Sequence, residues 1–195
     1  MKQKKYFFER KYRTYDELKD IFEHSKSLNR FKKTANLVDR KNNIILDVGC
    51  GAGYLSVLLD DKMKLYVGTD LLDSNITIAK LFYDKKNRIF TTEDIFLDNN
   101  AFVKKNYFDY VLLLELIGHV DNPGLYIKRV HELLKKGGHI IVSTPNAVSI
   151  TNILWNIKNR NRIVTKYSVD GTETDHVMTW INKLFRIFLC AMDLR

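Results

Sequence analysis

The stretch NNIILDVGCGAGYLS, residues 42–56, decides the fold. Its apolar run at 44–48 predicts a strand buried on both faces, as in a sheet that helices cover on each side. Glycines then alternate at Gly49, Gly51 and Gly53, where a Cβ would obstruct a tight turn and a close backbone approach. Ligands of open parallel sheets bind at the carboxyl ends of the strands, so we expect a binding loop here, led by Asp47.

Short apolar runs and helical patterns alternate after residue 43. Strands are expected at 44–48, 65–69, 88–91, 110–114 and 139–143, and helices at 15–25, 28–38, 54–60, 74–84, 124–136, 148–158 and 179–190, with Gly137 and Gly138 ending the helix at 124–136. This alternation predicts an α/β fold, a Rossmann-like doubly wound parallel sheet with helices on both faces.

Composition and charge are those of one globular domain. The 195 residues are 45% hydrophobic and 28% charged. Lys and Arg outnumber Asp and Glu by 13 to 6 in residues 1–41 and by 7 to 4 in 151–195, whereas 42–150 carry 12 against 13. The basic flanks indicate either a solvated surface or a cap for an acidic substrate, nucleic acid or an anionic membrane surface.

Several features that the sequence lacks indicate where the protein is located and whether it binds a metal. Cys50 and Cys190 form no disulfide framework, which fits a reducing compartment. The basic N-terminus has no apolar segment behind it, and the longest apolar run, 110–117, is interrupted by Glu115 and too short for a bilayer. We expect a cytoplasmic protein without a transmembrane segment, and no spacing suggests a metal site.

The spacing of the glycines discriminates between ligands. A dinucleotide loop reads G-x-G-x-x-G, but here Tyr54 stands where its third glycine would be. A carboxylate at Asp47 would also repel a pyrophosphate and attract a cation. The loop therefore favours a positively charged ligand.

The segment DVGCGAG (47–53) resembles the first motif of the class I S-adenosylmethionine-dependent methyltransferases, and the resemblance extends over roughly 30–190. It implies S-adenosyl-L-methionine as cofactor. Asp70, in VGTDLL, would accept hydrogen bonds from the ribose hydroxyls. Asp94, in TTEDIFLD, would contact the adenine amino group, and Ile95 would pack on its ring. The resemblance assigns cofactor binding to Arg30, Asp47, Gly49, Gly51, Asp70, Leu71, Asp94, Ile95 and Leu114.

The segments FDYVLLLELIGHVDNP and LLKKGGHIIVSTPN are similar to the subgroup of ubiquinone-biosynthesis O-methyltransferases and of sugar and natural-product methyltransferases. That subgroup carries an E-x-x-E-H-like segment, in which Gly118 here replaces the second acid. His119 is the candidate catalytic base, or alternatively a histidine that bonds the loop backbone. His176 resembles a family histidine ahead of a helix that covers the site, or is structural.

The resemblance implies a single domain with three parts: a basic helical cap (1–41), a cofactor-binding core (42–146) and acceptor-side helices (147–195). It implies methyl transfer to a small-molecule, lipid-linked or glycan acceptor at an oxygen atom. The alternatives are an RNA or protein methyltransferase, which the basic N-terminus suggests, and a non-catalytic cofactor-binding or regulatory module. Nucleic acid is less favoured because no N-P-P-Y or D-P-P-Y segment follows the fourth strand.

The chain ends at Arg195, where the family's sixth strand would begin. We therefore expect the usual last two strands to be lacking: the chain is truncated, or the missing edge is supplied by a partner or left out. An uncovered edge strand pairs readily with another chain, so we expect poor solubility or self-association.

Overall fold

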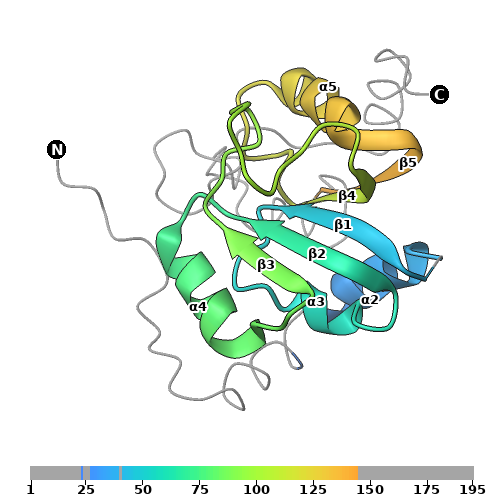
Figure 1. The fold of residues 1–195 in the computed structure, drawn as a ribbon, viewed down its shortest axis with the longest axis vertical. Helices are drawn as coiled ribbons and strands as arrows, with labels where there is room; N and C mark the ends of the chain where they lie inside the picture. Colours follow the sequence, from blue (N-terminus) through green and yellow to red (C-terminus); the bar gives the residue numbers. More distant parts are fainter. Residues whose placement is uncertain (1–22, 24–26, 40, 145–195) are drawn as a thin grey trace, which may run out of the picture.

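A computed structural model describes residues 23, 27–39 and 41–144. Five parallel strands form one sheet in the order β3-β2-β1-β4-β5 (Figure 1). The strands are β1 (Asn43–Val48), β2 (Met63–Thr69), β3 (Arg88–Thr91), β4 (Phe108–Leu114) and β5 (Leu134–Ser143), and the helices are α2 (Ser27–Leu37), α3 (Leu55–Leu58), α4 (Asp73–Tyr83) and α5 (Pro123–Leu133). The strand order reverses beside β1, which is the position where such sheets bind ligands. The predicted doubly wound fold is confirmed.

Helices cover both faces of the sheet. Helices α2, α3 and α4 pack on one face and α5 packs on the other (Figure 1). Side chains alternate along β1, so Ile45 joins the first core cluster and Leu46 the second, and both are fully buried. An apolar run without alternation is what a strand between two helical layers requires.

Local signals explain where several elements begin. Helix α5 starts behind Asn122, whose side chain accepts a 3.0 Å hydrogen bond from the Leu125 backbone N–H, with Pro123 in its first turn. Strand β3 has the bounds that the sequence predicts. Strands β1, β2 and β4 start one or two residues before their predicted first residues. Helix α3 is shorter than predicted.

The predicted end of α5 is wrong. The helix stops at Leu133, and Leu134 begins β5 with extended backbone angles. Leu134 pairs with Phe108 of β4 and is 7% exposed, so burial of this leucine in the sheet outweighs the helical periodicity. Gly137, at φ 79°, then lies inside β5, where the pairing to β4 is irregular.

The predicted helices at 148–158 and 179–190, His176 and nearly all of the predicted helix at 15–25 lie outside the described residues. The expected lack of two further strands concerns residues beyond 144 and stays a prediction. In the described ranges, no helix has the length and apolar character needed to cross a membrane.

Candidate functional site

The glycine loop is the first component of the site. Gly49, Gly51 and Gly53 have φ angles of 75°, 53° and 78°, in the left-handed region that favours glycine. The backbone N–H groups of Gly49 and Cys50 donate to the carbonyl of Thr69 over 2.7 and 2.9 Å, which ties the loop to the end of β2. The loop therefore closes over the carboxyl ends of the two central strands.

Gly53 is also required by packing. A Cβ at this position would lie 2.6 Å from the ring of Phe90 and 3.0 Å from the Cβ of Ala79. The loop thus contacts β3 and α4 directly. Gly51 has no atom within 4 Å of such a Cβ, so only its backbone angle calls for glycine.

Asp70 follows β2 and holds the loop from the other side. Its Oδ2 accepts a 2.9 Å hydrogen bond from the Gly51 N–H, and its Oδ1 accepts a 2.9 Å bond from the Leu72 N–H. Both carboxylate oxygens are thereby oriented by the backbone. The half-buried carboxylate lines the cavity described below.

Asp47 lies beneath the loop and is 3% exposed. The hydroxyl of Tyr66, on β2, donates a 2.5 Å hydrogen bond to Asp47 Oδ2. Burial raises the pKa of Asp47 from 3.8 to about 7; the Tyr66 bond opposes this increase, Asp70 adds to it, and Arg30 opposes it. Burial together with these two acids also raises the pKa of the Cys50 thiol, so Cys50 stays protonated near neutral pH.

The segment after β3 forms the opposite wall. Asp94 Oδ1 accepts a 2.9 Å bond from the Phe96 N–H, and the Glu93 carboxylate accepts bonds of 2.9–3.3 Å from the backbone N–H groups of residues 101–103. Arg129, on α5, donates to the carbonyls of Ile95 (2.5 Å) and Leu97 (3.2 Å). These bonds fix the segment to itself and to α5.

The three parts enclose a cavity of about 160 Å³ at the carboxyl edge of the sheet. It is lined by Val48, Gly49, Thr69, Asp70, Leu71, Glu93, Asp94, Ile95, Leu116 and Tyr126. Five of these residues, Gly49, Asp70, Leu71, Asp94 and Ile95, are among those that the sequence assigns to cofactor binding. Asp70 and Asp94 offer carboxylate acceptors, and the buried Ile95 offers an apolar surface.

Five lining residues were not predicted. Val48 and Thr69 end their strands, and Glu93 precedes Asp94, so strand register and adjacency could have identified all three. Tyr126 comes from α5, and its ring meets that of Phe96 edge-on at 4.7 Å between centroids. Nothing local in the sequence indicates that this tyrosine reaches the site, whereas Leu116 follows the end of β4 and its position could have identified it.

The other predicted site residues lie elsewhere. Arg30, Asp47, Gly51 and Leu114 are not among the residues that line this cavity. Arg30 Nη1 is 3.6 Å from Glu115 Oε1, and Glu115, at φ 58°, receives a 2.9 Å bond from the Ser143 hydroxyl. His119 is exposed, in a turn closed by its own N–H and the Leu116 carbonyl (2.9 Å). The predicted roles of Arg30 and His119 therefore stay predictions.

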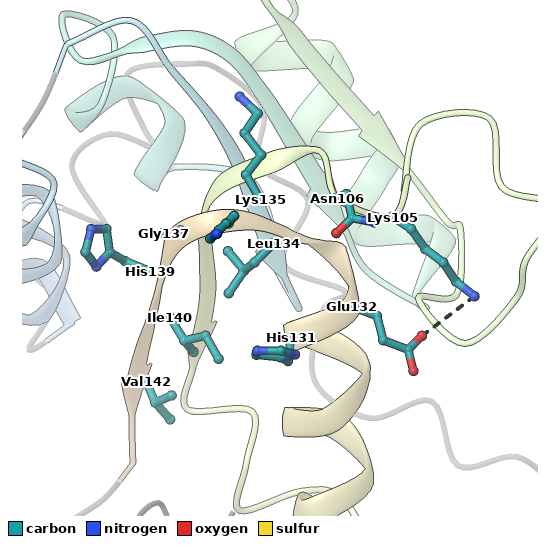
Figure 2. Close-up of a pocket in the computed structure, with 12 residues that line it drawn as sticks. Lys105, Asn106, His131, Glu132, Leu134, Lys135, Gly137, His139, Ile140 and Val142 are labelled. Atoms are coloured by element: carbon teal, nitrogen blue, oxygen red, sulfur yellow. Dashed lines mark ion pairs between the residues drawn. The ribbon is translucent and has the colours of Figure 1, made fainter. Parts of the chain in front are cut away.

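A second cavity, of about 900 Å³, lies between α5 and β5 (Figure 2). His131 and Glu132 of α5, His139 of β5 and Lys105 are among the residues that line it, and Lys105 pairs with Glu132 at 3.7 Å. It shares no residue with the glycine-loop cavity. Because ligands of doubly wound sheets bind at the carboxyl ends of the central strands, we assign the candidate site to the smaller cavity.

The chemistry of the smaller cavity is that of an anionic crevice. Asp70 and Asp94 present acceptors for hydroxyl and amino groups, and Asp47 adds buried negative potential below the loop when its carboxyl is ionised. Among the residues that the structure describes, no group of three or more His, Cys, Asp or Glu side chains could hold a metal ion. The arrangement suits a nucleoside that carries a positive charge.

Comparison with known proteins agrees with this arrangement. Residues 16–180 match the family model described as "Methyltransferase domain". The chain is 29% identical over 139 residues to the ubiquinone biosynthesis O-methyltransferase of Idiomarina loihiensis, covering 71% of this chain and 51% of the relative. It is 37% identical over 107 residues to that of Bradyrhizobium diazoefficiens, covering 52% and 40%.

The chain thus spans about half of the length of these curated relatives. A crystal structure of a SAM-dependent methyltransferase from Archaeoglobus fulgidus superposes with a TM-score of 0.62 at 17% identity, covering 93% of this chain and 74% of that one, which supports the fold. Since the family model covers most of the sequence, including the glycine loop and every residue of the cavity, the chain belongs to the methyltransferase domain family.

Proposed function

We propose that the protein transfers a methyl group from S-adenosyl-L-methionine to a small-molecule, lipid-linked or glycan acceptor at an oxygen atom. The observation that carries the proposal is the Asp70 carboxylate, which is fixed by the Gly51 N–H and faces the cavity. A carboxylate in this position fits ribose hydroxyls. The ubiquinone biosynthesis O-methyltransferases among the relatives support an oxygen acceptor.

The residues of the cavity fit this cofactor. Asp70 would hold the ribose, Asp94 and Ile95 would hold the adenine, and Gly49 would let the backbone approach closely. When bound, the cofactor supplies an electrophilic methyl group on a positively charged sulfur. The protein's contribution is to orient that methyl group and to exclude water. His119, after β4, would accept the proton of an acceptor hydroxyl.

Isothermal titration with S-adenosylmethionine tests the cofactor. We expect micromolar or tighter binding to the wild type and at least a tenfold loss in Asp70→Ala. Asp61→Ala is the matched control, since Asp61 is an exposed acid in the turn before β2 and does not line the cavity, and it should bind as the wild type does. Absence of binding to the folded wild type would overturn the proposal. Binding without turnover on any hydroxyl acceptor would favour the non-catalytic module, and methylation of RNA or protein would favour those acceptors.

We also propose that β5 mediates self-association. Within the described residues, β5 pairs with β4 on one side and with no strand on the other. Free backbone groups along an edge strand favour pairing with another chain. Multi-angle light scattering between 0.05 and about 5 mg/ml would detect a rising mass, and a constant monomer mass would contradict this proposal.

A further inference from the structure

The hydrogen-bonded pair of Tyr66 and Asp47 lies below the glycine loop, and neither residue lines the cavity. Tyr66 is fully buried and Asp47 is 3% exposed, and the two side chains make a direct 2.5 Å hydrogen bond. They face each other from adjacent strands, because β1 and β2 pair with Asp47 opposite Gly68, two residues beyond Tyr66. The tyrosine ring thus extends from the core to the base of the glycine loop.

We propose that Tyr66 is a positioning residue for Asp47, and that binding of the positively charged cofactor expels a proton from this pair. The proposal rests on the proposed function, since it takes S-adenosylmethionine as the ligand. Among the described residues, no basic side chain is bonded to Asp47, and the group that donates to it is a neutral phenol. The carboxyl therefore changes charge when a nearby charge changes.

The charges around the pair determine the direction of the effect. Asp70 at the end of β2 disfavours ionisation of Asp47, and Arg30 of α2 favours it. Burial raises the pKa of the Tyr66 hydroxyl well above its usual value, Asp47 and Cys50 add to this increase and Arg88 of β3 opposes it, so Tyr66 remains the donor. With the pKa of Asp47 at about 7, the free protein at neutral pH is a mixture of protonated and ionised carboxyl.

A bound ligand with a positively charged sulfur would stabilise the ionised Asp47 carboxylate, and the Asp47 proton would pass to the buffer. After methyl transfer the sulfur of S-adenosylhomocysteine is neutral, so this stabilisation disappears and the carboxyl takes a proton back. The pair thereby favours the charged cofactor over its product. The two ligands carry the same adenosine and amino-acid groups, so they isolate the effect of the sulfonium charge.

The test is calorimetric titration of the full chain with each ligand at pH 7, in buffers of different ionisation enthalpy, to count released protons. We expect about half a proton released with S-adenosylmethionine and clearly less with S-adenosylhomocysteine. Below pH 7, the Kd of S-adenosylmethionine should rise by up to about tenfold per pH unit, while that of the product changes less. Equal proton release with both ligands overturns the proposal and leaves the cofactor assignment intact, whereas failure of both to bind overturns the proposed function.

Tyr66→Phe tests the role of the tyrosine. Loss of the donated bond should shift the midpoint of proton release to higher pH and weaken S-adenosylmethionine binding at pH 7. Tyr110→Phe is the matched control, because Tyr110 is also buried and donates a 2.5 Å bond to an aspartate, Asp39, away from the loop. An unchanged midpoint in folded Tyr66→Phe contradicts the positioning role. The comparison of the two ligands on the wild type tests the proton linkage even if the variant does not fold.

Discussion

The carboxylate of Asp70 holds the backbone N–H of Gly51 at 2.9 Å, so the end of β2 fixes the loop that follows β1. Nineteen residues separate the two positions along the chain. The bond joins the glycine loop to the acid that would bind the ribose. The glycine loop is therefore part of the ligand site and part of the fold at the same time.

Alanine substitution should separate the two reasons for glycine in this loop, which are the positive φ angle and the lack of room for a Cβ atom. Gly51→Ala should cost about 1–2 kcal/mol of unfolding free energy, because its φ is 53° but its Cβ would meet nothing within 4 Å. Gly53→Ala should cost more, by about 1–3 kcal/mol, because its Cβ would also meet Phe90 and Ala79. Urea denaturation of each variant measures the two costs.

Gly137→Ala is the control for backbone strain, since its φ is 79°, its Cβ is unobstructed and it lies in β5. It should lose as much stability as Gly51→Ala. Equal costs at all three positions would show that the contact between the loop and β3 does not constrain Gly53.

The buried Asp47 should make stability depend on pH. The unfolded carboxyl ionises near pH 4, but the folded one holds its proton up to about pH 7. Between these values the folded state binds more protons, so the free energy of unfolding should fall as pH rises from 4 to 7 and level off above, by at most about 4 kcal/mol. The pKa of Asp60 is lowered, chiefly by its Lys85 bond, so Asp60 makes the free energy of unfolding rise with pH, and it does so at lower pH than Asp47.

Asp47→Asn removes this carboxyl while keeping its size. Urea denaturation at several pH values should show a flatter dependence between pH 5 and 8 in this variant, and greater stability than the wild type at pH 8. If the two curves stay parallel over this range, Asp47 does not titrate as described.

Arg129 should control the segment that carries Asp94 and Ile95. Arg129, which is 8% exposed, donates to the Ile95 and Leu97 carbonyls and forms a 3.0 Å ion pair with Asp98. Arg129→Lys should lower stability by about 1–3 kcal/mol and speed amide hydrogen exchange at residues 101–103. It should also weaken S-adenosylmethionine binding severalfold.

Arg88→Lys is the matched control for Arg129→Lys. Arg88 is likewise buried, donates to the Tyr83 carbonyl and pairs with Asp60, but it does not contact residues 93–103. It should lose similar stability without faster exchange at 101–103. Equal exchange in both variants would mean that Arg129 acts only on global stability.

His119 is the candidate base, and its substitution should affect chemistry alone. His119→Ala should lower kcat about 10²- to 10⁴-fold on a hydroxyl acceptor with no change in the Kd of S-adenosylmethionine. His131→Ala is the control, because His131 is also exposed but lines the cavity beside α5 and β5. A kcat within twofold of the wild type would favour the backbone-bonding alternative for His119.

The sequence could predict much of the site because its chemistry is concentrated where strands end. Asp70, Asp94 and Gly49 each lie just after a strand that the sequence predicts, and parallel strands bring their carboxyl ends to one edge. Tyr126 and Arg129 could not be found in this way. Tyr126 lines the cavity and Arg129 bonds to the segment that forms its wall, and both come from a helix whose docking on the sheet depends on the whole core of that face.

The sequence by itself determined the fold class, the glycine loop and the acids around it, because strand and helix periodicity and strand-end position are local properties. The tertiary structure alone decided that α5 ends at Leu133, since pairing of Leu134 with Phe108 outweighs helical periodicity. It also decided that Asp47 bonds to Tyr66, nineteen residues away. That bond depends on the register of two strands, and register is fixed only when the complete sheet is buried between its helices.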